Sequence, residues 1–162
     1  MRPIVVFDAY GTLWGAVVGD WAAVRLRPHA IEVLQQLARG YDLALWTTAS
    51  RSNFGYLLRQ FPDLAAVFSR IVTRDDVPTD AQSYLPERQQ EGRISKNIRL
   101  IGGDVLVDDA DDAIAEAQAF GFRLIRAPSI LFESADQLAQ LDGDDWMLQL
   151  PRLIEEALAD GP

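Results

Sequence analysis

The sequence contains no cysteine and a single histidine, His29. The absence of cysteine excludes disulfides and metal sites built from thiolates, and it is typical of a cytoplasmic protein. No run of 18 apolar residues is present that could form a membrane-spanning helix, and the amino terminus lacks the pattern of a secretory signal. We therefore expect a cytoplasmic protein without a membrane partner.

Basic residues are outnumbered, with 15 Lys and Arg against 24 Asp and Glu. The formal net charge is −9 at pH 7, which argues against an extended nucleic-acid interface because phosphate contacts need clustered Arg and Lys. Lys96 is the only lysine, and every other basic residue is arginine. A compact ammonium reaches crowded anionic sites where a guanidinium does not fit, so Lys96 is a candidate functional residue. The alternative is a lysine retained by chance.

The order of apolar segments predicts the fold class. Short apolar runs that are typical of buried strands alternate with helical patterns, which indicates an α/β fold with a parallel sheet between helices. At 162 residues, a single domain over residues 1–162 is expected. The expected strands are 4–7, 43–47, 68–73, 105–107 and 122–125, and the expected helices are 30–38, 50–60, 111–120, 135–141 and 146–158. Residues 14–26 are expected to be a short connection and residues 75–93 a long surface loop.

Polar residues stand at the carboxyl ends of three expected strands: Asp8, the pair Thr47 and Thr48, and the pair Asp108 and Asp109. The carboxyl ends of parallel strands meet at one edge of the sheet, where ligands bind. A carboxylate there can act as a nucleophile, a base or a metal ligand. The alternatives are a turn-forming Asp8, ordinary strand-end threonines, and acids that suit a helix amino terminus.

These segments resemble the four motifs of the haloacid dehalogenase (HAD) superfamily. Asp8-Ala9-Tyr10-Gly11-Thr12 is similar to the Asp-x-x-Gly-Thr signature of the first motif. Thr48, or Thr47 one register earlier, matches the second motif, and Lys96 matches the third. Asp108 and Asp109, with Asp112 further on, match the acidic fourth motif. The resemblance implies a Rossmann-like three-layer sandwich, and the short segment after the first motif implies a minimal cap or none.

The resemblance also implies the chemistry of a Mg²⁺-dependent phosphatase. Asp8 would be the nucleophile that forms an aspartyl-phosphate, and Thr12 would order the turn. The phosphoryl oxygens would be held by Thr48 (or Thr47) and the amide of Ala49, and Lys96 would neutralise charge. The implied Mg²⁺ ligands are Asp8, the backbone carbonyl of Tyr10, and Asp108, with Asp109 or Asp112 in support. Asp111 is expected only to suit the helix amino terminus.

One position departs from the family pattern. Tyr10 stands where family phosphatases carry a second Asp as general acid and base, which implies slow turnover of substrates with poor leaving groups. The alternatives are a 2-haloacid dehalogenase and a catalytically weak protein that binds phosphate or a partner.

The short insertions suggest an open site. Arg27-Pro28 and the segment 45–50 show a weaker similarity to phosphatases that act on the RNA polymerase carboxy-terminal domain. The implied partner is a phosphorylated small molecule or an exposed phosphate on a macromolecule. Trp14, Trp21 and Trp46 are expected in the core or in a pocket wall.

Overall fold

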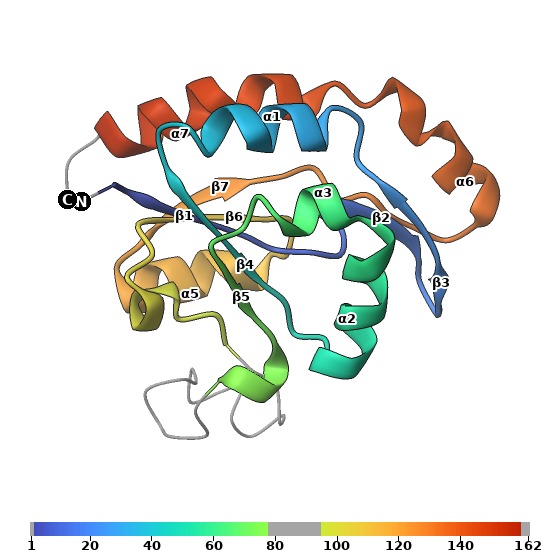
Figure 1. Cartoon of the computed structure of the whole chain (residues 1–162), viewed down its shortest axis with the longest axis horizontal. Helices are drawn as coiled ribbons and strands as arrows, with labels where there is room; N and C mark the ends of the chain where they lie inside the picture. Colours follow the sequence, from blue (N-terminus) through green and yellow to red (C-terminus); the bar gives the residue numbers. More distant parts are fainter. Residues whose placement is uncertain (1, 78–94, 160–162) are drawn as a thin grey trace.

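A five-stranded parallel sheet forms the centre of the computed structural model, which describes residues 2–77 and 95–159 (Figure 1). The strands run in the order β5-β4-β1-β6-β7. They are β1 (Ile4–Phe7), β4 (Asp42–Trp46), β5 (Arg70–Val72), β6 (Val105–Asp108) and β7 (Arg123–Arg126). β1 lies in the middle and pairs with β4 and β6, so Asp8 leaves the sheet at the centre of its carboxyl edge. The predicted Rossmann-like α/β fold is confirmed.

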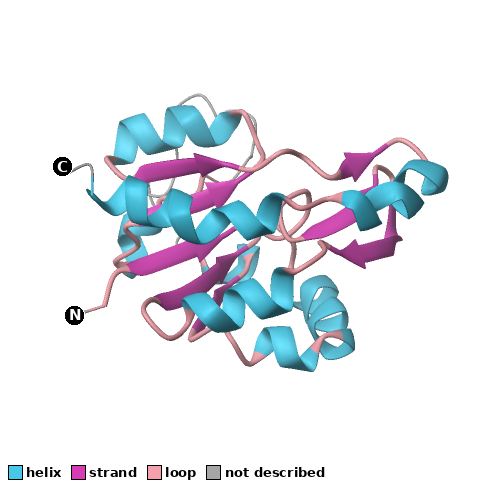
Figure 2. Cartoon of the chain, turned by 90° about the horizontal axis from the view of Figure 1, so that it is seen from above, coloured by secondary structure: helices cyan, strands magenta, loops and turns pink. Residues whose placement is uncertain are grey.

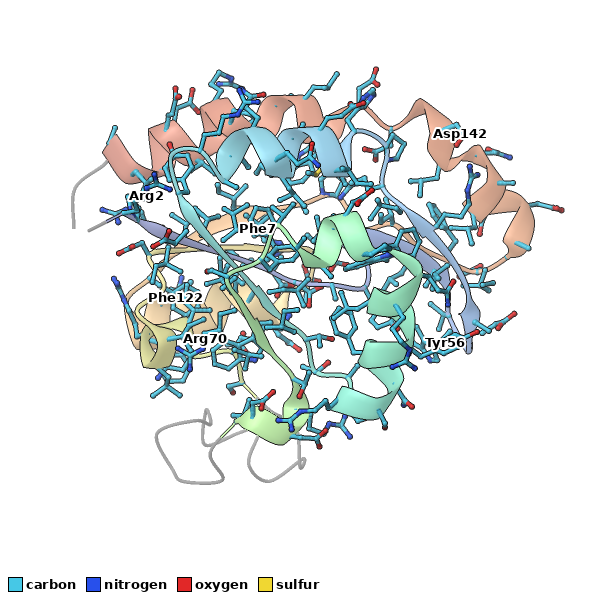
Figure 3. The ribbon with its side chains drawn as sticks, viewed as in Figure 1. Arg2, Phe7, Tyr56, Arg70, Phe122 and Asp142 are labelled. Carbon is cyan, nitrogen blue, oxygen red and sulfur yellow. The ribbon has the colours of Figure 1, made fainter. Side chains whose placement is uncertain are left out.

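Helices cover both faces of the sheet because its strands are apolar on both sides. Val5 and Phe7 pack with the helices on one face, whereas Val6 packs with those on the other. The first face carries α1 (Ala30–Leu37), α2 (Arg51–Gln60), α3 (Pro62–Ala65) and α7 (Leu150–Ala159). The second carries α5 (Asp112–Phe120) and the 3-10 helix Ile98–Ile101. Figure 3 shows Phe7 in the interior between the sheet and the first helical layer.

The expectation of a plain connection over residues 14–26 was wrong. This segment is a hairpin of β2 (Trp14–Val17) and β3 (Asp20–Leu26), and β8 (Leu131–Phe132) pairs with β2 to complete a second, three-stranded sheet. The turn between the hairpin strands is only two residues long, and Gly19 adopts a φ of 87° there. Figure 2 shows this small sheet beyond the carboxyl ends of the main strands. The hairpin is short, as the predicted minimal cap requires.

The remaining predicted elements are present with shifted ends. The predicted helix 135–141 is α6 (Ala135–Ala139) followed by a 3-10 turn, and the predicted helix 146–158 begins as 3-10 helix before α7. In the predicted loop 75–93, a 3-10 helix spans Arg74–Asp76, and residues 78–93 lie outside the described residues. Among the residues described, every helix is too short or too polar to cross a membrane.

Candidate active site

Four charged residues meet at the carboxyl edge of the sheet. Asp8 follows β1, Asp108 ends β6 and Asp109 comes next, while Lys96 precedes the 3-10 helix 98–101. The Nζ of Lys96 donates to Oδ2 of Asp108 at 2.6 Å and to Oδ1 of Asp8. Asp8, Lys96 and Asp108 are all buried. Parallel pairing of β1 with β6 brings Asp8 and Asp108 together although they are about a hundred positions apart in the sequence, and Lys96 reaches both from 12 positions before Asp108.

Burial and crowding shift the protonation equilibria of this group. Burial, together with the negative charges of Asp108 and Asp109, raises the pKa of Asp8 from 3.8 to about 7, and Lys96 only partly offsets this. Burial alone would lower the pKa of Lys96, but its two carboxylate partners outweigh it and raise that pKa. The surroundings therefore favour the charged form of Lys96 and disfavour the charged form of Asp8.

The loop after β1 connects Asp8 to Asp109. The Thr12 hydroxyl lies 3.3 Å from Oδ2 of Asp8 and 3.0 Å from Oδ1 of Asp109, and it accepts a hydrogen bond from the Asp109 amide. Gly11 has a φ of 87°, and a Cβ on it would lie 2.3 Å from Oδ2 of Asp109. Only glycine suits this position, because it tolerates that φ and leaves room for the carboxylate.

A buried arginine holds the same loop from behind. Arg27 donates from Nη1 to the Thr12 carbonyl and from Nη2 to the Pro128 carbonyl, both at 2.8 Å. Its guanidinium also forms a bidentate pair with Asp144, with both bonds at 3.0 Å, and lies 4.8 Å from the ring centre of Trp146. Arg27 thus joins the loop after β1, which contains Thr12, to the carboxy-terminal segment that contains Asp144 and Trp146.

The two threonines at the end of β4 face different surroundings. Thr47 is buried and its Oγ1 accepts a hydrogen bond from the Ala49 amide at 3.2 Å. Thr48 is exposed and, with Ala49, lines the cleft next to Asp8. Thr47 is not among the residues that line this cleft, so its side chain supports the loop whereas Thr48 faces the site.

The acidic residues at and after the end of β6 differ in whether they join the carboxylate group around Asp8. Asp8, Asp108 and Asp109 bring carboxylate oxygens within 4.8 Å of one another. Asp112, the first residue of α5, lines the cleft but is not part of this group of three. Asp111 occupies the N-cap position without a side-chain capping bond and pairs with Arg126 at 2.9 Å. Three carboxylates facing one ammonium carry excess negative charge, and their hard oxygen donors fit a divalent cation such as Mg²⁺.

The charged group lies in a cleft of about 880 Å³. Its lining includes residues that the sequence did not single out as functional: Asn53, Tyr56, Gln60, Glu116 and Leu131. Tyr10 and Trp21 line it as well, and their ring centres are 5.4 Å apart in an edge-to-face arrangement. Trp14 and Trp46 lie in the core, while Trp21 lies in the pocket wall, as predicted. Tyr56 stands outside the buried positions of α2, Phe54 and Leu57, and an aromatic residue at an exposed helix position is a signal that could have identified it from the sequence.

Solved structures of HAD-type hydrolases share this fold. A haloacid dehalogenase-like hydrolase from Streptococcus pneumoniae matches with a TM-score of 0.61 and 12% identity, over 94% of this chain and 98% of the other. A HAD-superfamily hydrolase of subfamily IA from Geobacter sulfurreducens gives 0.59 and 16%, over 94% and 100%. Fcp1, an essential RNA polymerase II CTD phosphatase, gives 0.57 and 18%, over 98% of this chain but 52% of Fcp1. At these identities the likeness establishes the fold alone.

Sequence comparison identifies the family. Among curated proteins, none matches the chain significantly. The model of the NLI interacting factor-like phosphatases, in contrast, matches residues 3–124, a span that contains Asp8, Thr48, Lys96 and the acidic pair after β6. Since this span is most of the chain, the protein belongs to the NLI interacting factor-like phosphatases and is a hydrolase of the HAD superfamily.

Proposed function

We propose that this protein is a Mg²⁺-dependent phosphatase that works through an aspartyl-phosphate on Asp8. The observation that carries the proposal is the contact of buried Lys96 with buried Asp8 and Asp108, beside half-buried Asp109, at the ends of the central strands. A nucleophilic carboxylate, a fixed positive charge and a cation site are the three parts that attack on a phosphate dianion needs.

The proposed reaction has two steps. A carboxylate oxygen of Asp8 forms a bond to phosphorus, and the bond between phosphorus and the leaving-group oxygen breaks. Water then attacks the phosphorus of the aspartyl-phosphate, which releases inorganic phosphate and restores Asp8. Lys96, in contact with Asp8, neutralises negative charge that develops on the phosphoryl oxygens. Thr12 keeps Asp8 oriented through its hydroxyl.

Thr48 and the amide of Ala49 are the proposed contacts for the phosphoryl oxygens. Both line the cleft beside Asp8, whereas Thr47 is buried. The Ala49 amide donates to Thr47, so a bound phosphoryl group would replace or share that hydrogen bond. We therefore favour Thr48 over Thr47 as the threonine of the second motif.

Asp8, Asp108 and Asp109 are the proposed protein side chains that hold Mg²⁺, together with the backbone carbonyl of Tyr10. When bound, the cation offsets the repulsion between the Asp8 carboxylate and the phosphate dianion. Asp112 lines the same cleft outside the group of three, which suits a contact through water.

Tyr10 is a poor replacement for a carboxylic general acid. An ordinary phenol has a pKa of about 10, and partial burial raises the pKa of Tyr10 further. We propose slow turnover of phosphate esters whose leaving groups need a proton. The substrate would be a phosphorylated small molecule or an exposed phosphate on a macromolecule, in an open cleft.

The test measures hydrolysis of p-nitrophenyl phosphate with Mg²⁺ and with excess chelator. We expect chelation to abolish turnover, and Asp8→Asn to lower kcat by roughly 10³-fold or more. Asp111→Asn is the matched control because Asp111 is exposed and lies outside the carboxylate group. It should change kcat by less than about twofold.

Three other outcomes would contradict the proposal. Undiminished hydrolysis in chelator would exclude a metal-dependent mechanism. Halide release from 2-chloropropionate without added metal would identify a dehalogenase. Phosphate binding without turnover of any phosphate ester would identify a binding protein.

A further inference from the structure

The cleft has two chemically different walls. Its carboxylates come from the ends of β1 and β6 and from α5: Asp8, Asp108, Asp109, Asp112 and Glu116. The other wall is built from the β2–β3 hairpin and α2, and its described lining residues, among them Trp21, Asn53, Tyr56 and Gln60, include no carboxylate and no imidazole. A substituent bound against this wall would meet rings, amides and small or aliphatic side chains, and no acidic group.

Tyr10 joins this second wall through its ring. The Tyr10 ring packs edge-to-face with Trp21 on one side, at 5.4 Å, and with Phe54 of α2 on another, at 6.2 Å. Phe54 in turn packs edge-to-face with buried Trp14 at 5.7 Å. The Tyr10 ring is therefore supported from the core, and Tyr10 follows the proposed nucleophile by two residues and lines the same cleft.

Two aromatic side chains of the same wall are open to solvent. Trp21 is 51% exposed and Tyr56 is 65% exposed, although both line the cleft. Figure 3 shows Tyr56 projecting from α2 beside the end of the hairpin. Aromatic rings that line a cleft bind flat apolar groups with a preference for edge-to-face or offset stacking.

We propose that the preferred substrate is an aryl phosphate monoester, whose ring packs against Trp21 and Tyr10 while its phosphate lies at Asp8. This inference rests on the proposed phosphatase function and specifies its substrate class. In the first step Asp8 bonds to phosphorus and the aryl oxygen leaves with the bonding electron pair as a phenoxide, which takes its proton from water. A phenol has a pKa of about 10, so a phenoxide can depart without an acid in the wall, whereas an alkoxide cannot do so readily.

Three esters separate ring recognition from leaving-group chemistry. Phenyl phosphate has a ring and a phenoxide leaving group, benzyl phosphate has a ring and an alkoxide leaving group, and cyclohexylmethyl phosphate has an alkoxide leaving group and no aromatic ring. With Mg²⁺ we expect kcat/KM for phenyl phosphate to exceed that for benzyl phosphate by roughly 10²-fold or more. We expect the KM of cyclohexylmethyl phosphate to exceed that of benzyl phosphate by about threefold.

Substitutions at Trp21 and at Tyr10 test the two halves of the proposal, which are ring recognition and the choice of leaving group. Trp21→Ala should raise the KM of phenyl and benzyl phosphate by about three- to tenfold, while Trp21→Phe, which keeps a ring, should change it by less than about twofold. Tyr10→Asp should narrow the gap between phenyl and benzyl phosphate by raising kcat for the benzyl ester. Leu148→Ala is the control, because Leu148 is exposed and does not line the cleft.

The outcomes separate this inference from the proposed function. If the unaltered protein hydrolyses none of the three esters, or if Asp8→Asn hydrolyses them equally well, the phosphatase function itself fails. If all three are hydrolysed through Asp8 but benzyl phosphate is as good a substrate as phenyl phosphate, or Trp21→Ala has no effect on KM, the aryl preference is overturned.

A last experiment tests whether the aryl phosphate belongs to a protein or to a small molecule. Phenyl phosphate is compared with a phosphotyrosine peptide and with the same peptide carrying phosphoserine. Preference for the phosphotyrosine peptide over both would indicate a protein substrate, and preference for phenyl phosphate would indicate a small molecule. Preference for the phosphoserine peptide would overturn the proposal.

Discussion

In the part of the chain that the structure describes, two cationic side chains, Arg27 and Lys96, are buried near the loop after β1, and their surroundings differ in charge. Arg27 faces one carboxylate, two backbone carbonyls and an aromatic ring, so its charge and its donors are matched. Lys96 contacts two carboxylates, Asp8 and Asp108, and a third, Asp109, lies in the same group. The first cluster is balanced as it stands. The second keeps an excess of negative charge, which is the condition that a cation site needs and a structural ion pair avoids.

The largest expected contrast is in stability. Arg27→Met leaves Asp144 and two carbonyls without their donor and should lower the free energy of unfolding by about 3 kcal/mol. Asp8→Asn removes a carboxylate whose pKa is already raised by burial and like charges, so it should cost less than about 1 kcal/mol in metal-free protein at pH 8. Urea denaturation followed by circular dichroism measures both.

The matched control for Arg27 lies two residues earlier. Arg25 pairs with Asp142 at 2.5 Å, but both side chains are exposed, so Arg25→Met should cost less than about 1 kcal/mol. Equal losses for Arg25→Met and Arg27→Met would mean that burial does not distinguish the two pairs. If Asp8→Asn lowers the free energy of unfolding as much as Arg27→Met does, the surroundings of Arg27 and of Lys96 do not differ in the way described.

The next effect concerns pH and magnesium. The folded pKa of Asp8, about 7, lies above its ordinary value of 3.8. This group therefore favours the folded metal-free protein most below about pH 4, and that contribution is lost as pH rises to 7. Mg²⁺ needs the deprotonated carboxylate, so its affinity should fall by about tenfold per pH unit below pH 7.

Calorimetric titration of Mg²⁺ in buffers of different ionisation enthalpy measures the proton that binding releases. We expect release of close to one proton at pH 6 and little at pH 8.5, and a larger rise in melting temperature with Mg²⁺ at pH 8 than at pH 5.5. A Mg²⁺ affinity that does not change with pH would show that Asp8 is not a ligand. The Asp8→Asn variant should lose the proton release.

The smallest expected effect concerns Thr12, which contacts both Arg27 and the carboxylates around Lys96. The Thr12 carbonyl accepts from Arg27, and its hydroxyl contacts Asp8 and Asp109. Thr12→Val keeps the carbonyl and the shape but leaves the Asp109 amide without an acceptor, which should cost about 1–2 kcal/mol and about tenfold in kcat. Thr12→Ser keeps the hydroxyl and should retain most of the stability and most of kcat. If Thr12→Val loses stability but keeps its kcat, Thr12 supports the fold and does not act in the reaction.

The sequence predicts the sheet well because its strands are apolar runs that end in polar residues. The buried runs 5–7 and 105–107 sit on neighbouring central strands, so the meeting of Asp8 with Asp108 follows from topology. Lys96 was singled out by its rarity, and the structure places it against both carboxylates. The hairpin is not predicted, because Gly15 and Gly19 suit a short connection as well as they suit strands. Gly15 instead makes room for Leu138, which a Cβ would approach to 2.9 Å.

The partner of Arg27 and the aromatic wall could not be predicted in the same way. Asp144 is one of many carboxylates in the chain, and its selection depends on where the carboxy-terminal segment packs. The packing of Tyr10 between Trp21 and Phe54 likewise depends on the hairpin and α2 approaching each other. Local patterns specify which elements form, whereas these contacts depend on three-dimensional packing that residue spacing does not encode.

The pairing of Arg27 with Asp144 also bears on how the chain is made. The two residues are 117 positions apart, so on the ribosome Arg27 is synthesised long before its carboxylate partner. The β2–β3 hairpin is a local element and can form early, but the loop after β1 gains the support of Arg27 only when Asp144 and Trp146 have emerged. A nascent chain that stalls before Asp144 would carry Asp8 on a loop that lacks the support of the pair between Arg27 and Asp144.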